Sequence, residues 1–178
     1  DWSKFGDPWS YRRYNHTVKV SFPDHTVLAV PYDVPVIGYG TDNINTLRLW
    51  QCEAEEELDF NAFNDQDYLR ALAQKNKAED ITRVLYPNDS TWEGKRLRLK
   101  QQYVLSSASL QDMLRTYKIS HGNDLSRFGE FYAVQLNDTH PAMSIPELIR
   151  LLQLEGMSFD EAFKVAQKTF SYTNHTVL

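Results

Sequence analysis

The stretch YAVQLNDTH, residues 132–140, decides the fold class when it is set beside SYTNHTV, residues 171–177. Residues 132–136 and 171–177 each have the pattern of a short strand, and the sequence between them predicts two helices of about ten residues each. A connection that contains helices joins parallel strands. The sequence therefore predicts an α/β fold in which these two strands run parallel.

Polar residues lie at the same end of both strand candidates. Residues 137–140, Asn-Asp-Thr-His, leave the first strand, and residues 174–176, Asn-His-Thr, lie at the same end of the second. In open parallel sheets, ligands bind outside the carboxyl ends of the strands, where the loops converge. We therefore expect two histidines, one aspartate and two asparagines to face one cleft.

Such a group of side chains can bind a metal, carry out acid–base catalysis or hydrogen-bond a polyhydroxylated ligand. Metal has the least support, because Asp138 and His140 lie two positions apart with no Cys nearby and match no common zinc pattern. A protein nucleophile is not indicated, because the sequence has neither a Gly-x-Ser-x-Gly elbow nor a glycine-rich phosphate loop. A purely structural alternative is an Asx-type turn with a satisfied histidine.

The first third of the chain predicts strands. Residues 17–22 alternate apolar and polar side chains, and a turn separates them from a short apolar run at 26–30. Residues 31–40 contain two prolines and two glycines, which predicts irregular or turning backbone. Residues 46–52 predict another strand. Residues 53–59 contain five carboxylates in seven positions and predict a solvated acidic loop.

Helical spacing begins after Asp65, with an interruption expected near Lys77. Three Ser-x-x-Glu pairs then predict capped helix starts, since each pair can satisfy two backbone amides reciprocally. The pairs are Ser90 with Glu93, Ser144 with Glu147, and Ser158 with Glu161. The first helix is expected to run to about Lys118, and Gly156 is expected to end the second.

These patterns predict a single domain over residues 1–178. Within it, residues 1–64 form a strand-rich part, residues 65–130 form two long helices with a loop at 86–92, and residues 131–178 form the strand–helix–helix–strand crossover.

Composition excludes several classes of protein. The chain has 178 residues, with 19 Lys and Arg against 24 Asp and Glu, giving a formal charge of −5 that argues against a nucleic-acid partner. No apolar run approaches the roughly 18 residues of a membrane span. The one cysteine excludes an intrachain disulfide and predicts a cytoplasmic location. Because the sequence starts at Asp1 with no leader and stops abruptly after a strand candidate, we expect a piece of a longer parent.

Six blocks of sequence resemble the glycogen, starch and maltodextrin phosphorylases, in the family's order. The blocks are AVPYDVP (29–35), NTLRLW (45–50), RVLYPND (83–89), LRLKQ (97–101), QLNDTHP (135–141) and YTNHT (172–176). The resemblance implies the later part of the N-terminal domain of a glycosyltransferase B-type, Rossmann-like enzyme, with a mixed sheet and flanking helices. It also implies a parent that uses pyridoxal phosphate and orthophosphate to release glucose 1-phosphate from α-1,4-glucans.

The resemblance assigns substrate-binding residues by position. Asn88 and Asp89 match a gate loop that closes over the glucosyl site. The other matches lie around the sugar: Arg98, Asp138, His140, His175 and Thr176. Ser90, Thr91 and Trp92 depart from the residues found in some members, so the finer sugar contacts of this loop do not carry over.

The resemblance also predicts partners. A helix from Asp67 to about Asn76 matches one that packs against its counterpart in a homodimer, and the C-terminal domain of the parent completes the cleft. The cofactor lysine lies outside this chain in the family, so no catalytic or cofactor-binding residue is assigned here. The isolated chain is expected to bind no pyridoxal phosphate and to be inactive. The alternative is a stand-alone, non-catalytic module for glucan binding or dimerisation.

Overall fold

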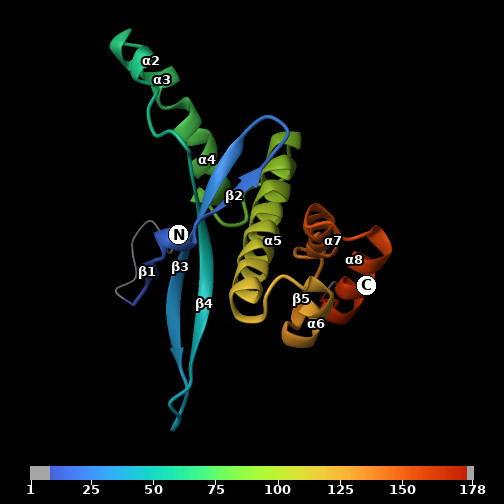
Figure 1. The fold of residues 1–178 in the computed structure, drawn as a ribbon. Helices are drawn as coiled ribbons and strands as arrows, with labels where there is room; N and C mark the ends of the chain where they lie inside the picture. Colours follow the sequence, from blue (N-terminus) through green and yellow to red (C-terminus); the bar gives the residue numbers. More distant parts are fainter. Residues whose placement is uncertain (1–8, 176–178) are drawn as a thin grey trace. The chain divides into compact units, whose positions relative to one another are not determined.

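The computed structural model describes residues 9–175 and divides the chain into two compact units, the first ending at Gln101 and the second beginning at Gln102. Together they hold both antiparallel and parallel strand pairs with flanking helices, as the α/β prediction requires (Figure 1). The single domain expected over residues 1–178 stays a prediction.

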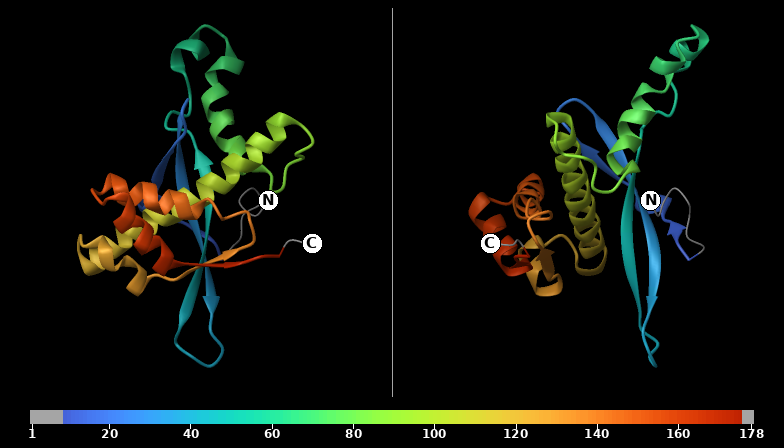
Figure 2. Two further views of the ribbon diagram at one scale, coloured as in Figure 1. Left: turned by 90° about the vertical axis from the view of Figure 1, so that its right-hand side faces the viewer. Right: turned by 180° about the vertical axis from the view of Figure 1, so that it is seen from behind.

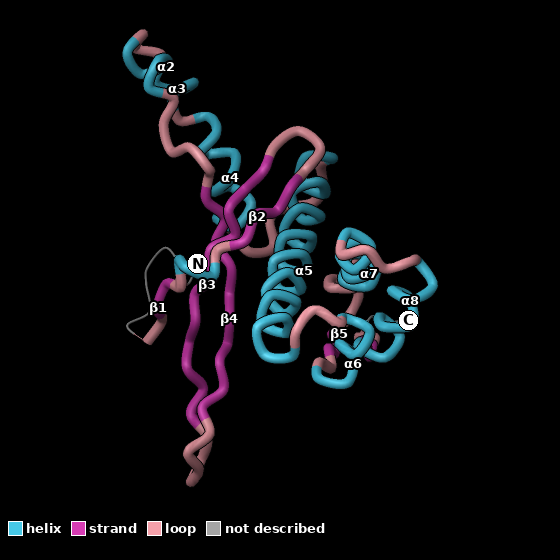
Figure 3. Tube along the Cα trace, in the orientation of Figure 1, coloured by secondary structure: helices cyan, strands magenta, loops and turns pink. Residues whose placement is uncertain are grey.

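The first unit is built on an antiparallel sheet. Strand β3 lies at its centre, with β1 and β2 on one edge and β4 along the other (Figure 3). Helix α4 packs on β4, and the Cys52 amide donates to Thr82 Oγ1 on that helix at 2.9 Å. The elements are β1 (Tyr11–Arg12), η1 (Tyr14–His16), β2 (Val18–Ser21), β3 (Thr26–Ile37), β4 (Ile44–Glu53), α2 (Phe60–Asn64), α3 (Tyr68–Ala71), α4 (Ala73–Arg83) and the start of α5 (Trp92–His121).

The prediction of irregular or turning backbone over residues 31–40 is wrong for residues 31–37, because β3 continues through both prolines to Ile37, and it is confirmed for residues 38–40, where the chain turns. The carbonyl of Pro31 faces the edge that carries β1, where it accepts the Arg13 amide at 2.8 Å. Pro35, four residues on, faces the same edge, and no described strand pairs with that edge beyond Asp33. A proline lacks only the N–H, so a position at an unpaired edge tolerates it.

The interruption expected near Lys77 is also misplaced. The helical segment breaks at Leu72, between α3 and α4, and Lys77 lies inside α4. The acidic stretch after β4 contains no helix before Phe60, and α2 starts there with Asp59 as its N-cap.

The second unit contains the predicted crossover. Strands β5 and β6 pair in parallel, with Val134 opposite Phe170 and Asn137 opposite Thr173, and two helices connect them (Figure 2). The core beneath them includes Leu114, Tyr117 and Leu148, all buried. The elements are the rest of α5, then η2 (Leu125–Arg127), α6 (Phe128–Phe131), β5 (Val134–Asn137), α7 (Ser144–Leu154), α8 (Phe159–Thr169) and β6 (Phe170–Thr173).

The helix ends test the capping predictions. Ser158 and Glu161 form the complete capping box at the start of α8, as predicted. Gly156 ends α7 with φ of 97°, and the Met157 amide donates to Leu152 O at 3.1 Å, which is the expected glycine-dependent helix end.

The other two boxes are wrong. Thr91 rather than Ser90 caps α5, since its hydroxyl accepts the Gly94 amide at 3.1 Å. At α7 the N-cap is Met143 rather than Ser144: the Ser144 amide donates to Pro141 O in the preceding turn, and the Glu147 amide donates to Met143 O as the first bond of the helix. The side chains of Ser144 and Glu147 are buried and form hydrogen bonds with Ser106 and Ser107 on α5 instead.

Candidate functional site

The carboxyl ends of β5 and β6 bring three of the predicted residues together, which we name the strand-end cluster: Asp138, His140 and His175. Asp138 follows β5 with φ of 72°, a left-handed conformation that Asp tolerates better than most side chains. Its amide donates to Thr173 O at 2.8 Å, and its Oδ1 accepts the His175 amide at 3.3 Å. Asp138 thus ties the end of one strand to the end of the other.

The second carboxylate oxygen of Asp138 faces an imidazole. His140 Nε2 lies 3.5 Å from Asp138 Oδ2, with the histidine side chain 45% exposed and the aspartate side chain 22% exposed. His175 is exposed. An accessible carboxylate beside an imidazole offers both acceptors and a donor, the combination that a polyhydroxylated ligand can match.

Neighbouring polar groups lie at the same strand ends. Asn137 is the last residue of β5, and Asn174 directly follows β6. Gln135 Nε2 donates to Thr173 Oγ1 across the two strands at 2.6 Å. Thr176, the remaining predicted residue here, lies outside the described residues.

In the first unit, the predicted loop at 86–92 lies against the first turn of α5. The Ser90 amide donates to Asn88 Oδ1 at 2.8 Å in an Asx-type turn, and Tyr86 has φ of 53°. A Cβ added to Gly94 would lie 2.0 Å from Asn88 O and 3.1 Å from the Asp89 Cα. Only a glycine at position 94 lets the loop approach the helix this closely.

Arg98 on α5 holds this loop. Its guanidinium forms an ion pair with Asp89 and lies 5.9 Å from the centroid of the Tyr86 ring. Nearby, Gln101 Nε2 donates to Val84 O at 2.8 Å. The Asp89 side chain is half exposed, so the carboxylate is reachable from solvent while it is paired. The structure therefore groups Asn88, Asp89 and Arg98 in the first unit.

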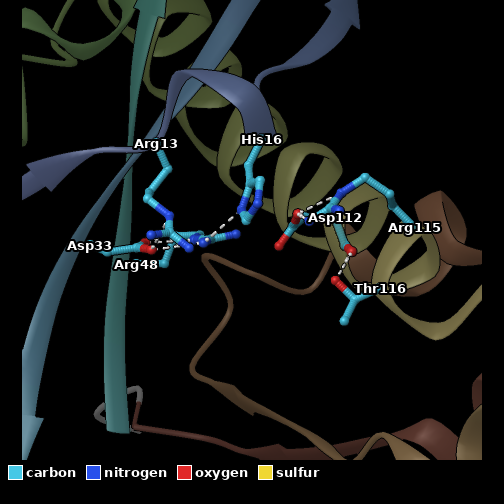
Figure 4. Close-up of polar contacts among 7 residues, drawn as sticks. All are labelled: Arg13, His16, Asp33, Arg48, Asp112, Arg115 and Thr116. Carbon is cyan, nitrogen blue, oxygen red and sulfur yellow. Dashed lines mark hydrogen bonds and ion pairs between the residues drawn. The ribbon is translucent and has the colours of Figure 1, made fainter. Parts of the chain in front are cut away.

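A buried charge cluster in the first unit was missed from the sequence. The Asp33 side chain, 4% exposed, accepts from Arg48 Nε at 2.7 Å and Nη2 at 2.8 Å (Figure 4). His16 Nδ1 lies 3.2 Å from Arg48 Nη2, and Arg13 Nε lies 3.7 Å from Asp33 Oδ2. Asp33 and Arg48 are opposite each other in the β3–β4 register. Opposite charges in two neighbouring strands were the available signal, but it identifies a pair only once the register is known.

A second charged group lies along α5 in the other unit. Arg115 donates from Nη2 to Asp112 Oδ1 at 2.7 Å, and Thr116 Oγ1 donates to the Asp112 carbonyl at 2.9 Å (Figure 4). These are contacts between residues three and four positions apart on one helix, so they stabilise the helix locally.

Other candidate chemistry is sparse in residues 9–175. No three His, Cys, Asp or Glu side chains there gather as a metal site would require. None of the described helices has both the length and the apolar character needed to cross a membrane. The Cys52 thiol is buried, and burial raises its pKa to about 12.

Comparison with known proteins relates the chain to one family. The family model described as carbohydrate phosphorylase matches residues 1–178. The liver form of glycogen phosphorylase from Homo sapiens is 44% identical over 200 aligned residues, which cover 100% of this chain and 24% of that protein. Glycogen phosphorylase 2 from Dictyostelium discoideum is 43% identical, with 99% of this chain and 20% of that protein covered. The chain thus spans about a quarter or less of the length of these relatives. On the strength of the family match over its full length, the chain belongs to the carbohydrate phosphorylase family.

Proposed function

We propose that this chain is part of a cytoplasmic α-glucan phosphorylase, which releases glucose 1-phosphate from α-1,4-glucans with orthophosphate, and that it supplies one side of the glucosyl site. The observation that carries the proposal is the strand-end cluster. It lies at the carboxyl ends of two parallel strands, where ligands of such sheets bind. The family match and the relatives named glycogen phosphorylase support the substrate class.

The cluster can recognise a sugar through several distinct contacts. Asp138 offers a carboxylate acceptor, His140 offers a ring nitrogen, and the backbone carbonyl of His175 offers a further acceptor. The bond from the His175 amide to Asp138 fixes the direction of that backbone. These groups bind and orient the substrate, and preorganised polar groups of this kind contribute to catalysis through positioning and electrostatics. On the family resemblance alone, we propose Thr176 and Arg98 as further substrate-binding residues.

The loop at 86–92 acts as a gate in this proposal. Its attachment through Arg98 and Asp89 lies on the surface of the helix, and a half-exposed ion pair is weak enough to exchange. We expect Asn88 and Asp89 to move when substrates enter. Hydrogen exchange at residues 86–92 of the full-length enzyme should change when glucan and orthophosphate are added, and unchanged exchange would refute the gating role.

The described residues do not fit pyridoxal phosphate. The lysine that binds this cofactor forms a Schiff base, but every lysine among residues 9–175 is exposed or half exposed. Several are committed to ion pairs, such as Lys77 with Asp24 and Lys118 with Glu155. We therefore propose that the cofactor is held by the C-terminal domain of the parent, and that the isolated chain binds none and has no activity.

The homodimer contact is proposed for the segment from Asp67 to Asn76. The structure divides it between α3 and α4, with Asp67 capping α3 by accepting the Arg70 amide at 3.1 Å. Leu69 is 89% exposed and Leu72 is exposed as well, so an apolar face is available for a second copy. Replacement of Leu69 by Glu should shift the full-length protein toward monomer in analytical ultracentrifugation, and an unchanged dimer would argue against this contact.

The decisive experiment is an assay of the full-length protein that contains this chain. Purified enzyme with orthophosphate and an α-1,4-glucan should release glucose 1-phosphate, and Asp138→Asn should reduce the release. Glu161→Gln, at the exposed capping box of α8, is the matched control, because it also replaces a carboxylate by an amide. A full-length product that binds glucan or dimerises without phosphorolysis would instead favour the non-catalytic module.

A further inference from the structure

The second unit contains a buried carboxylate outside the strand-end cluster. Glu147 lies in the first turn of α7, and its side chain is 3% exposed. It accepts from Ser107 Oγ on α5 at 2.6 Å, and from Arg150 Nε and Nη2 at 2.7 and 2.8 Å. Tyr103 OH lies 3.3 and 3.4 Å from its two oxygens. Both carboxylate oxygens therefore have hydrogen-bond donors.

A buried carboxylate is costly unless its charge and lone pairs are compensated, and here they are. The hydrogen bonds from Arg150 to Glu147 raise the pKa of the guanidinium, while burial and the nearby carboxylate raise the pKa of the Tyr103 phenol. One more polar contact joins the helices, from Ser144 Oγ to Ser106 Oγ at 2.9 Å. We name this set the α5–α7 polar seam: Tyr103, Ser106, Ser107, Ser144, Glu147 and Arg150.

The polar seam fixes how α7 lies on α5. Apolar side chains remain in contact when two helices slide slightly, but hydrogen bonds weaken steeply as their distances and angles change. A fully satisfied buried network therefore selects one arrangement of the helices. Glu147 is its centre, because its carboxylate accepts hydrogen bonds from Tyr103, Ser107 and Arg150.

The start of α7 is coupled to the strand-end cluster by a short stretch of turns. The Ala142 amide donates to Thr139 O at 3.1 Å, and the Ser144 amide donates to Pro141 O at 2.9 Å. His140 lies within these turns, so it moves with the first turn of the helix. Asp138 is instead bound to the other strand through Thr173 O. A displacement of α7 would therefore separate His140 from Asp138.

We propose that Glu147 is a positioning residue, which holds His140 beside Asp138 by fixing α7 on α5 through the polar seam. Glu147 itself does not touch the substrate. The inference rests on the proposed function, in which the strand-end cluster binds and orients the glucan for phosphorolysis.

The test uses the full-length enzyme with two variants at the seam. Glu147→Gln keeps the volume and removes the charge, and the double variant Glu147→Met with Arg150→Leu removes both charges and fills the space with apolar atoms. The Glu147 carboxylate is buried and the Arg150 side chain is 50% exposed, so the double variant removes the buried charge without leaving a charged partner unpaired, and it separates positioning from folding. Glu161→Gln is the control, because its carboxylate lies in the exposed cap of α8.

Two quantities are measured, kcat/KM for the glucan and the ring resonance of His140 in 13C-histidine-labelled enzyme. A misplacement of about 1 Å can reduce catalysis roughly 100-fold, so we expect both seam variants to lose about 10- to 100-fold in kcat/KM. The His140 resonance should shift in both seam variants. In the control variant it should not shift, and kcat/KM should stay within about twofold of that of the unmodified enzyme.

A folded double variant with unchanged kcat/KM and an unchanged His140 resonance overturns the proposal, whatever Glu147→Gln does to folding. If the full-length protein shows no phosphorolysis, the proposed function fails and the His140 resonance alone decides the structural inference. A shift in the double variant then supports positioning by Glu147, and no shift refutes it.

Discussion

Removal of the Arg48 side chain should destabilise the first unit far more than removal of an arginine from the surface. Arg48→Ala leaves the Asp33 carboxylate, 4% exposed, with Arg13 Nε at 3.7 Å as its remaining charged neighbour. Breaking a buried pair costs about 3–5 kcal/mol, and the residual contact with Arg13 places our expectation near the lower end, at about 3 kcal/mol. Arg83 also pairs with two carboxylates, but its side chain is 47% exposed, so Arg83→Ala should cost about 0.5 kcal/mol.

Urea unfolding of the purified chain measures both costs, with tryptophan fluorescence as the signal. Trp50 is a suitable probe, because it is buried in the same sheet and lies 5.9 Å from the Arg48 guanidinium. The double variant Asp33→Leu with Arg48→Leu should be more stable than Arg48→Ala, since it leaves no uncompensated charge. If Arg48→Ala costs no more than Arg83→Ala, or if the double variant is the least stable, the account of this cluster is wrong.

Three further predictions concern local features. Gly94→Ala should destabilise the chain and raise hydrogen exchange in the preceding loop, because a Cβ 2.0 Å from Asn88 O forces the loop backbone away from the helix, at a cost above the roughly 1 kcal/mol that alanine gains in helix propensity; unchanged exchange would contradict the close approach. Hydrogen bonds from Ser158 lower the pKa of Glu161, so their contribution to stability is present above pH 4.5 and lost as pH falls through the lowered pKa. In Glu161→Gln the stability should lack this loss at acid pH. If the variant and the unmodified chain lose stability identically as the pH falls, the prediction is wrong. Burial raises the pKa of Cys52 to about 12, so a disulfide reagent at pH 8 should label it only in urea, and rapid labelling of the native chain would show that the thiol is accessible.

Several features follow from signals that lie within a few residues of each other. The capping box of Ser158 and the helix end at Gly156 depend on hydrogen bonds within one turn, so the sequence alone predicts them. The parallel pairing of β5 and β6 follows from the helices between them, which allow only a crossover connection. That topology in turn explains why Asp138 and His175, far apart in sequence, meet at one end of the strands.

Other features could not be read from local pattern. Pro31 and Pro35 are ordinary turn signals, and they are accommodated in β3 only because both face an edge that needs no further donor. The Ser144 and Glu147 pair matches a capping box, but the helix starts one residue earlier, at the N-cap Met143, so Pro141 O and Met143 O already accept the two amides that the box would serve. In β3 and at the start of α7 alike, the hydrogen-bond partners that decide the structure lie outside the short sequence motif.

The sequence by itself determined the class of this chain: the α/β pattern, the crossover and the phosphorylase blocks, because periodicity, capping and motif order are local properties. The tertiary structure decided which charges are buried and what they hold. Asp33 meets Arg48 across 15 residues of chain, and Glu147 meets Ser107 across 40. The physical reason is that a carboxylate is compensated by whichever donors the fold places within hydrogen-bond distance, and strand register and helix packing set that distance.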